Sequence, residues 1–245
     1  RSAVGRVNDV GVHRAGSLGM AFSTPLSPNF FIRFRRLRRD RDILHIHMPF
    51  HLADMALWLF GFKGKVAVWW HADILKQKRL LRLYKPFMRF LLRRADVIMT
   101  ATQGHIDHSS FLSPYRDKCV VIPFGVDPGL LEKSAQYANR ERPVGKPFSF
   151  LFVGRLVYYK GCDILLDAFT GVPDAELVLV GTGPLEEALK SQAHALGIEN
   201  RVRFRGEISD DALAEAFDGC DVFVLPSIAK TEAFALVQIE AMAYG

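Results

Sequence analysis

The chain alternates between short apolar segments, rich in β-branched and aromatic residues, and longer segments whose apolar residues recur at helical spacing. Nearly uninterrupted apolar runs, such as residues 66–70 and 148–153, are typical of strands that are buried on both faces of a sheet. The alternation predicts parallel strands joined by right-handed crossover helices. We expect strands at 20–24, 43–47, 65–71, 96–102, 119–123, 148–154, 176–181, 201–206 and 221–226, and helices at 30–39, 51–61, 78–94, 103–112, 160–170, 184–195, 209–219 and 233–244.

One segment interrupts this pattern, at residues 125–147, where prolines and glycines are frequent. We interpret it as a linker and expect an α/β protein with two Rossmann-like, doubly wound lobes. The first lobe comprises residues 1–140 and the second comprises residues 141–245. Because the chain begins without methionine and stops at Gly245, directly after an expected helix, we expect a truncation at both ends. The missing parts would be the first strand of the first lobe and the C-terminal part of the second.

The distribution of charge supports two different lobes. The 245 residues carry 32 Lys and Arg against 26 Asp and Glu, a net charge of +6. Residues 1–140 account for 23 basic and 10 acidic residues, a net of +13, whereas residues 141–245 account for 9 and 16, a net of −7. With 49% hydrophobic residues the chain has material for a large core, which excludes a disordered protein. The asymmetry predicts that only the first lobe faces an anionic partner.

The three cysteines, Cys119, Cys162 and Cys220, are far apart in the sequence and lie in apolar segments. An odd number without paired spacing argues against a disulfide framework and against zinc, and favours buried thiols in a reducing compartment. No apolar segment reaches the about 18–20 residues that cross a bilayer. The N-terminal residues also lack the apolar region of a signal peptide. We therefore expect a cytoplasmic protein.

Polar residues follow several expected strands, at the edge where open parallel sheets bind their ligands. The first such group is Gly154-Arg-Leu-Val-Tyr-Tyr-Lys-Gly161. Gly154 permits a close turn, and Arg155 and Lys160 bring two cations to the start of a helix, which suits a diphosphate. An equally simple interpretation is a strand-to-helix turn with solvated charges.

The second group is a loop with Glu232 followed by a helix that carries Glu240, eight residues later. We expect Glu240 on the inward face of the helix, among Leu236, Ile239 and Met242. A carboxylate among apolar residues needs hydrogen-bond donors, which the hydroxyl groups of a sugar or a ribose supply. The alternative is that Glu232 caps the helix and that Glu240 is an ordinary surface residue.

These groups resemble the motifs of retaining GT-B glycosyltransferases of family 4, also called glycosyl transferases group 1. The resemblance rests on the Glu-x7-Glu spacing and on Gly-Arg-Leu-x4-Lys-Gly. Supporting segments stand in the family's order across essentially all of 141–245. They are Val180-Gly-Thr-Gly-Pro, Val202-Arg-Phe-Arg-Gly, Asp221-Val-Phe-Val-Leu-Pro-Ser and Glu240-Ala-Met-Ala-Tyr-Gly.

The resemblance implies a site for a nucleotide-sugar donor in the second lobe. Arg155 and Lys160 would hold the diphosphate, Glu232 the hydroxyl groups of the sugar, and Glu240 those of the ribose. Ala235 stands where the family usually has glycine, so its methyl group would narrow the approach to the phosphate and leaves its role open. The implied donor-binding residues are Gly154, Arg155, Lys160, Glu232, Phe234, Ala235, Leu236, Val237 and Glu240, of which Leu236 and Val237 would contact the phosphate through their backbone amides.

A third group, Trp69-Trp-His71-Ala-Asp73, follows a strand of the first lobe. It resembles a Trp-His-x-Asp-Ile segment of family members with mannose or similar donors, which implies that His71 lies near the donor sugar and the reaction centre. Asp73 is equally well interpreted as a helix cap. Lys76 and Lys78 fit either an acceptor phosphate or a solvated helix start. The implied catalytic residues are His71, Arg155, Lys160 and Glu232.

The fourth group contains His45 and His47 on one face of a strand, with His51 after it. A zinc site would need His71 nearby. No acidic or cysteine ligand accompanies these histidines, and the resembled family transfers sugars without a metal. We therefore favour a structural or acceptor-positioning role and expect neither a metal nor a cofactor.

Together these features predict a retaining transferase that moves a hexose from a GDP- or UDP-linked sugar to a glycan or lipid-linked glycan in cell-surface polysaccharide or lipopolysaccharide synthesis. Mannose is the sugar that the Trp-His-x-Asp segment favours. Basic amphipathic helices at 30–39 and 78–94 predict peripheral binding to the anionic inner face of the cytoplasmic membrane.

Other functions remain open alternatives. A non-catalytic nucleotide-sugar sensor would share the same motifs, as would a glycogen- or sucrose-type synthase. A nucleic-acid-binding α/β protein would use the basic face, but the chain lacks the interleaved aromatic residues and the groove-reading helix of such proteins. We therefore expect no nucleic-acid partner.

Overall fold

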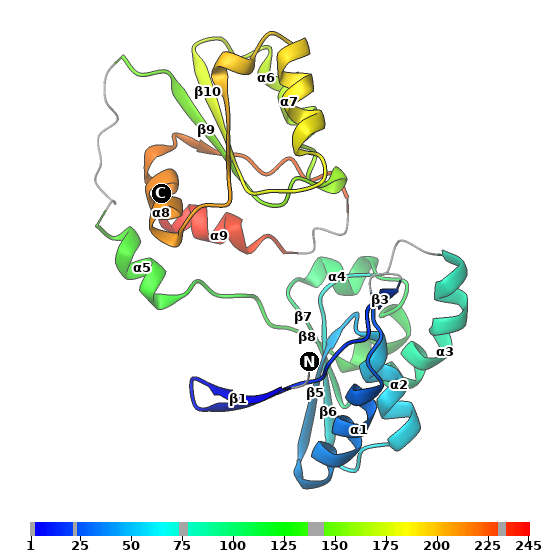
Figure 1. Cartoon of the computed structure of the whole chain (residues 1–245). Coiled ribbons are helices and arrows are strands. Elements are labelled where there is room, and N and C mark those ends of the chain that lie inside the picture. The colour runs from blue at the N-terminus through cyan, green and yellow to red at the C-terminus, as the bar shows by residue number, and fades with distance from the viewer. Residues whose placement is uncertain (1–2, 22–23, 74–77, 137–144, 230–233) are drawn as a thin grey trace. The chain divides into compact units, whose positions relative to one another are not determined.

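The structure, a computed structural model, describes residues 3–21, 24–73, 78–136, 145–229 and 234–245. The chain forms two compact units, Arg1–Pro123 and Phe124–Gly245, each built around its own parallel sheet (Figure 1). The expected boundary between residues 140 and 141 lies outside the described residues and stays a prediction.

Four parallel strands form the main sheet of the first unit, in the order β5-β6-β7-β8. The register of β5 and β6 places His45 beside Ala67 and His47 beside Trp69. The elements of this sheet and its connections are β5 (Ile43–Met48), β6 (Lys65–Trp70), β7 (Val97–Thr100), β8 (Cys119–Val121), α1 (Pro28–Leu37), η1 (Arg38–Asp40), α2 (His51–Phe60), α3 (Lys78–Arg94), α4 (Gln103–His108) and η2 (Ser113–Lys118).

The two faces of this sheet differ in burial. Val68 and Trp70 of β6 are at most 1% exposed and belong to the core formed with α2 and α3. His45, His47 and Trp69 occupy the alternate positions and therefore lie on the opposite face, since successive side chains of a strand point to opposite sides. The two histidines are exposed and Trp69 is half-buried, so this face is the more accessible one.

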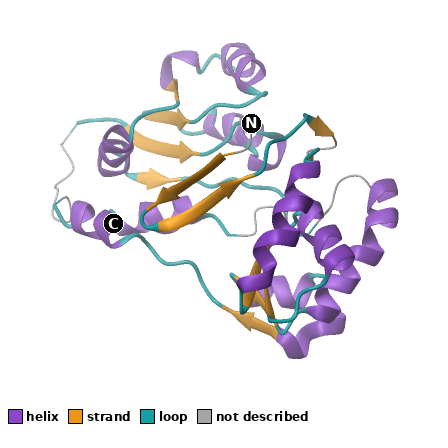
Figure 2. Ribbon diagram, turned by 60° about the horizontal axis from the view of Figure 1, so that its bottom comes forward, coloured by secondary structure: helices purple, strands orange, loops and turns teal. Residues whose placement is uncertain are grey.

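The second unit also contains four parallel strands, in the order β11-β10-β9-β12. Phe152 and Leu177 pack with α6 and α7, whereas Leu151 and Val180 pack with α8 and α9, so both faces are covered (Figure 2). The elements are α5 (Pro128–Ser134), β9 (Phe148–Val153), η3 (Tyr158–Lys160), α6 (Cys162–Phe169), β10 (Ala175–Val180), α7 (Glu186–Ala195), η4 (Glu199–Arg201), β11 (Val202–Gly206), α8 (Asp210–Gly219), β12 (Val222–Phe223) and α9 (Leu236–Ala243). The expected α/β architecture with parallel sheets is confirmed.

An antiparallel hairpin near the N-terminus was absent from the sequence expectations. Strands β1 (Ala3–Val7) and β2 (Val10–Arg14) pair directly through Val7 and Val10. Asn8 and Asp9 close the turn with φ values of 46° and 62°, a conformation that these two residue types tolerate better than most. A two-residue turn of this kind suits the right-handed twist of a hairpin.

The prediction that residues 20–24 form a strand of the parallel sheet is wrong. Strand β3 (Met20–Ala21) instead pairs antiparallel with β4 (Thr24–Pro25) in a separate two-stranded sheet. Pro25 has no N–H to donate, which confines it to the edge of a sheet. The apolar residues of this segment therefore do not extend the main sheet.

The segment 125–147, expected to be a linker, contains helix α5. Asp127 caps this helix, because its carboxylate accepts a hydrogen bond of 2.7 Å from the backbone N–H of Gly129. Pro128 occupies the first helical position, where its missing N–H costs nothing. A local Asp-Pro start signal therefore accounts for a helix within a stretch that is rich in proline and glycine.

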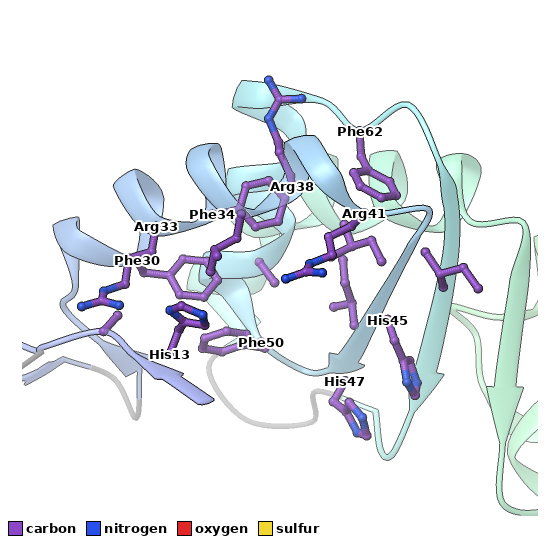
Figure 3. Close-up of a pocket in the computed structure, with 16 residues that line it drawn as sticks. His13, Phe30, Arg33, Phe34, Arg38, Arg41, His45, His47, Phe50 and Phe62 are labelled. Carbon is purple, nitrogen blue, oxygen red and sulfur yellow. The ribbon is translucent and has the colours of Figure 1, made fainter. Parts of the chain in front are cut away.

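A cavity of about 570 Å³ runs along the outer edge of β5 (Figure 3). All five residues 43–47 line it, and because their side chains alternate between the two faces, the cavity follows the edge of the strand. Among the described residues β5 pairs with β6 alone, and an open edge of this kind accepts a further strand. The cavity by itself therefore does not identify a ligand. Other lining residues are Phe30, Phe34, Phe50, Arg33, Arg38 and Arg41.

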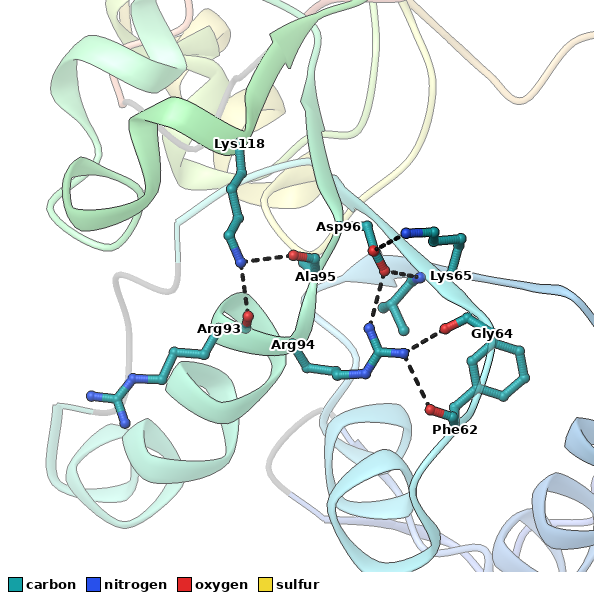
Figure 4. A network of polar contacts seen from close by, with 9 residues as sticks. Phe62, Gly64, Lys65, Arg93, Arg94, Ala95, Asp96 and Lys118 are labelled. Atoms are coloured by element: carbon teal, nitrogen blue, oxygen red, sulfur yellow. Dashed lines mark hydrogen bonds and ion pairs between the residues drawn. The ribbon is translucent and has the colours of Figure 1, made fainter.

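A charged network joins the end of α3 to the start of β6 (Figure 4). The carboxylate of Asp96 accepts hydrogen bonds from the backbone N–H of Val66 at 2.8 Å and from the ammonium group of Lys65 at 3.0 Å. The guanidinium of Arg94 lies 3.0 Å from Asp96 and donates to the carbonyl of Phe62 at 3.2 Å. The Val66 N–H and the Lys65 ammonium hold the pKa of Asp96 well below its usual range. The network fixes the loop that precedes β6.

A buried carboxyl group lies between α2 and α3. Asp54 has no exposed surface, and the hydroxyl of Tyr84 donates a hydrogen bond to its Oδ2 atom. Its Oδ1 atom has no hydrogen-bond partner among the described residues. Burial raises the pKa of Asp54 to about 8, so the neutral acid is the main form at pH 7.

Replacing Asp54 with Asn is expected to flatten the dependence of stability on pH. The pKa of this group is 3.8 without perturbation and about 8 in the fold, so between these values the folded state holds a proton that the unfolded state lacks. Stability is therefore expected to fall as the pH rises from about 4 to about 8, and to level off above that range. Urea unfolding at pH 5, 7 and 9 measures this change. The substitution Asp9→Asn, at an exposed position, serves as the control. If the stability of wild type and that of Asp54→Asn changed in parallel with pH, a raised pKa of Asp54 would be contradicted.

Candidate functional site

The turn after β9 brings together two of the expected donor-binding residues. A Cβ atom on Gly154 would lie 3.5 Å from the Nζ atom of Lys160, so the ammonium group lies beside the start of the turn. Lys160 is only 8% exposed, although lysine is among the residue types that are least often buried. Arg155, in contrast, is exposed. The turn therefore holds one cation inside the lobe and one at its surface.

Main chains approach each other closely around this turn. Gly161 has a φ of +66°, and a Cβ atom there would lie 2.3 Å from the carbonyl oxygen of Pro226, which follows β12. Gly181 has a φ of +119°, and its Cβ atom would lie 2.1 Å from the carbonyl oxygen of Gly154. The loops after β9, β10 and β12 therefore pack backbone against backbone. Gly161 and Gly181 belong to the motifs of the sequence, but this packing role was not predicted.

The start of α9 contains a further group of expected donor residues. The helix begins at Leu236, and Ala235 precedes it with a φ of −87° and a ψ of 94°, a conformation that alanine adopts readily. Among the described residues no side chain caps this helix. The ring of Phe234 lies 5.2 Å from that of Phe124, centroid to centroid. Glu232 lies outside the described residues, so neither its role as a cap nor its role in binding is tested.

Glu240 lies on a different part of the second unit. Its side chain is half-buried and lines a cavity of about 350 Å³ between α5, α8 and α9, together with Lys133 and Tyr244. None of the residues that line this cavity belongs to the turn with Lys160. Of the apolar neighbours expected on α9, Ile239 is half-buried like Glu240, whereas Leu236 is 45% and Met242 is 70% exposed. The structure therefore does not bring Glu240 and Lys160 into contact.

His71 lies directly after β6, at the carboxyl end of the first sheet. Its backbone N–H donates to the carbonyl of Met48 at 3.1 Å, and its Nε2 atom lies 2.8 Å from Nδ1 of His47. The rings of His45 and His47 have centroids 4.5 Å apart. Burial lowers the pKa of His71, and the nearby His47, His45 and His105 lower it further, so the ring is neutral near pH 7. Within the described part of the chain, no group of three His, Cys, Asp or Glu side chains has the arrangement of a metal site.

Asp73 holds two segments of the first unit together. Its Oδ1 atom accepts hydrogen bonds from the indole of Trp70 at 2.9 Å and from the hydroxyl of Ser109 at 2.7 Å. The residues between Asp73 and α3 lie outside the described part of the chain, so the interpretation of Asp73 as a helix cap stays untested. Lys76 is outside the described residues, and the side chain of Lys78 is not described. Ser109, 36 residues from Asp73, gave no signal in the sequence.

Two protein-family models match the chain. The model of the glycosyl transferase 4-like domain matches residues 1–125, and that of glycosyl transferases group 1 matches residues 134–245. The chain belongs to the family of the glycosyl transferase 4-like domain, and its second lobe matches the group 1 model. The family resemblance inferred from the motifs of the second lobe is confirmed, and the match to residues 1–125 extends it to the first.

Two curated relatives of this chain are named as sugar transferases. The D-rhamnosyltransferase WbpZ of Pseudomonas aeruginosa is 37% identical over 235 residues, which are 96% of this chain and 61% of the relative. The O-antigen chain mannosyltransferase C of Escherichia coli is 38% identical over 221 residues, which are 89% of this chain and 58% of the relative. The chain therefore spans about three fifths of the length of these proteins.

Solved structures confirm the GT-B fold of this glycosyl transferase. Sucrose-phosphate synthase from Thermosynechococcus elongatus aligns with a TM-score of 0.75 at 21% identity, over 99% of this chain and 66% of the other. Anabaena HepE in complex with UDP aligns with a TM-score of 0.66 at 22% identity, over 89% of this chain and 61% of the other. At these identities the likeness is one of fold.

The substitution Gly161→Ala is expected to destabilise this glycosyl transferase more than Gly197→Ala. Both glycines have a similar positive φ, +66° and +68°, so both variants carry the strain of a left-handed alanine. Only at Gly161 does the added methyl group collide with a carbonyl oxygen, whereas nothing lies within 4 Å at Gly197. We expect Gly161→Ala to lose at least about 1 kcal/mol more than Gly197→Ala in the free energy of unfolding, the lower end of overpacking costs. Urea denaturation tests this, and equal losses would refute the close approach.

Proposed function

We propose that the protein transfers a hexose, with mannose as the favoured sugar, from a GDP- or UDP-linked donor to a glycan or lipid-linked glycan, with retention of configuration. The reaction would serve the synthesis of cell-surface polysaccharide or lipopolysaccharide. The observation that carries the proposal is the buried ammonium group of Lys160 beside the Gly154 turn, within the motifs of the group 1 glycosyl transferases. The names of the rhamnosyl- and mannosyltransferase relatives support a sugar of this class.

Lys160 and Arg155 would act on the leaving group. Departure of the nucleotide builds negative charge on the β-phosphate, and a fixed cation in a water-poor site stabilises that charge more than water does. Lys160 is held in such a site, and Arg155 would approach the same diphosphate from the exposed side of the turn. Hydrogen-bond donors at the start of a helix attract phosphate in the same way. The amides of Leu236 and Val237 at the start of α9 would supply them.

The remaining donor contacts follow from the family resemblance. Glu232 would accept hydrogen bonds from the hydroxyl groups of the sugar, and Glu240 from those of the ribose. Phe234 and Ala235 would border the phosphate-binding end of α9. His71 would donate a hydrogen bond to a hydroxyl of the transferred sugar while its ring stays neutral. No carboxylate is assigned as a nucleophile, because the acceptor hydroxyl would itself attack the anomeric carbon from the face that the nucleotide leaves. The bond to the β-phosphate would break as the new glycosidic bond forms, and the leaving phosphate would accept the proton of the hydroxyl. The protein itself would need no bound cofactor.

Replacing Lys160 with Ala is expected to lower kcat by about 10²–10³, the usual loss when one preorganised donor to a developing anion is removed. The matched control is Lys190→Ala in the same lobe, since Lys190 lies at the surface of α7 and pairs with Glu186 and Glu187. Steady-state transfer from GDP- and UDP-sugars by the full-length protein measures the effect, with circular dichroism to confirm folding. Turnover near the wild-type rate in Lys160→Ala would remove this residue from the site. Donor binding without transfer by wild type would identify a nucleotide-sugar sensor instead.

The first lobe would face an anionic membrane at which the acceptor is held. Helix α3 contains no acidic residue, and its residues Arg82, Lys85 and Arg89 are exposed beside Leu83, which is 73% exposed. Helix α1 contributes less than its sequence suggests, because Phe30 and Phe34 pack against the core of the lobe. Among the described residues no helix has the length and apolar character needed to cross a membrane. The exposed basic residues of α3 are what supports a peripheral position on the inner face of the cytoplasmic membrane.

The double substitution Arg82→Gln and Arg89→Gln is expected to weaken binding to anionic vesicles about thirtyfold, at about 1 kcal/mol for each basic residue near the surface. The control pair Lys146→Gln and Lys190→Gln removes the same charge from the second lobe and is expected to bind like wild type. Cosedimentation with phosphatidylglycerol vesicles at low and high salt measures the difference. Equal weakening by both pairs would mean that net charge alone drives binding.

A further inference from the structure

Three histidines and a tryptophan form a cluster on the open face of the first sheet, and the proposed function uses only His71. His45 and His47 stand two residues apart on β5, near its carboxyl end (Figure 3). The ring of His47 stacks on Trp69 with an interplanar angle of 14° and a centroid distance of 6.3 Å. It also lies against His71, with ring centroids 5.1 Å apart. The ring of His47 therefore lies between the ring of Trp69 and that of His71, the expected catalytic residue.

The contact between His47 and His71 is a hydrogen bond between two ring nitrogens. Nδ1 of His47 and Nε2 of His71 are 2.8 Å apart, a normal distance for this bond. In a neutral pair one ring must donate its N–H and the other must accept it, so the tautomer of one ring determines that of its partner. Two protonated rings would leave no acceptor and would set two positive charges side by side. The pair therefore carries at most one charge while the bond persists.

The titratable groups around the pair also disfavour charge on His71. His45 lies beside His47 on β5, and His105 approaches from α4. Burial, His47, His45 and His105 all lower the pKa of His71. Asp73, the carboxylate nearest in sequence, accepts hydrogen bonds from Trp70 and Ser109. The cluster thus favours a neutral His71 whose orientation depends on His47.

We propose that His47 is a positioning residue that holds the ring of His71 in one orientation at the carboxyl end of the first sheet and couples the tautomer of His71 to its own. The inference rests on the proposed function, in which His71 contacts the donor sugar. It adds a task for the second histidine of the His-x-His segment, for which the sequence pattern favoured a structural or acceptor-positioning role. A sugar hydroxyl would meet a ring whose orientation is set before the substrate binds, which lowers the cost of ordering the site.

Nuclear magnetic resonance of ¹⁵N-histidine-labelled protein tests this directly. Long-range ¹H–¹⁵N correlations separate protonated from unprotonated ring nitrogens, and a His71→Asn sample assigns the signals. In wild type we expect complementary ring protonation, in which only one of Nδ1 of His47 and Nε2 of His71 carries the proton between them. In His47→Phe this hydrogen bond is lost and the tautomer ratio of His71 is expected to change, whereas the amide of His47→Asn restores a hydrogen bond to Nε2 of His71. The pKa of His71 is expected to rise in His47→Phe, since a neighbour that lowers it is gone. An unchanged tautomer and titration in His47→Phe would overturn the proposal.

Transfer kinetics supply the second readout. We expect His47→Phe to lower kcat by about tenfold to a hundredfold, the range typical for loss of a group that orients a functional histidine, with the KM of the donor nearly unchanged. His47→Asn should recover most of that loss. His108→Asn, an exposed histidine outside the cluster, is the control, and His45→Asn shows whether loss of any cluster histidine has the same effect. An equal loss in His47→Phe and His47→Asn would also overturn the proposal.

The two readouts separate this proposal from the proposed function. If His71→Asn transfers sugar at the wild-type rate, His71 has no part in the reaction, but the coupling of tautomers between His47 and His71 can still be present in the spectra. If His71→Asn is inactive and the spectra of His47→Phe match those of wild type, the proposed function stands and the positioning role fails.

Discussion

The close approach of main chains at the carboxyl ends of β9, β10 and β12 is the constraint on which the second lobe depends. At Gly161 and Gly181 a carbonyl oxygen of a neighbouring loop occupies the space that any side chain would need. The turn after β9 is therefore pressed against the loops beside it. Its shape carries the side chain of Lys160 inward, next to Gly154. In this position the ammonium group is shielded from most of the solvent, so its interactions with nearby charges are screened less than those of the exposed Arg155.

Regular features of the fold could be predicted from the sequence because they follow from local pattern. Strands such as β6 and β9 are buried apolar runs, and their positions follow from hydrophobicity and spacing alone. Elements with weaker patterns were missed. The hairpin β1–β2 is exposed along most of its length, and α5 depends on a single Asp-Pro start signal within a proline-rich segment. Lys160 and Gly154 are close in sequence, so their association followed from the motif.

Contacts between distant positions could not be predicted in the same way. His47 and His71 are separated by 24 residues, and Asp73 and Ser109 by 36. Each contact can therefore be predicted only when the strand register and the path of the following loop are known. The amphipathic pattern of a basic helix was also insufficient to predict a membrane-binding surface. The sequence of α1 suggested a membrane-binding face, but its apolar residues Phe30 and Phe34 pack against the core of the lobe. An amphipathic helix can cover its apolar face with the protein core as well as with a membrane, so the pattern alone does not distinguish the two.

The open outer edge of β5 has a consequence for the handling of this chain. An unpaired parallel strand offers its backbone groups to any other extended segment, including the same edge of a second molecule. Ile43, 65% exposed, adds apolar surface at that edge and would favour self-association into aggregates at high concentration. The arginines along the cavity, Arg33, Arg38 and Arg41, repel the same residues of another molecule. This repulsion would oppose self-association at the strand edge, and it weakens as salt screens the charges. The solubility of the chain should therefore depend on ionic strength.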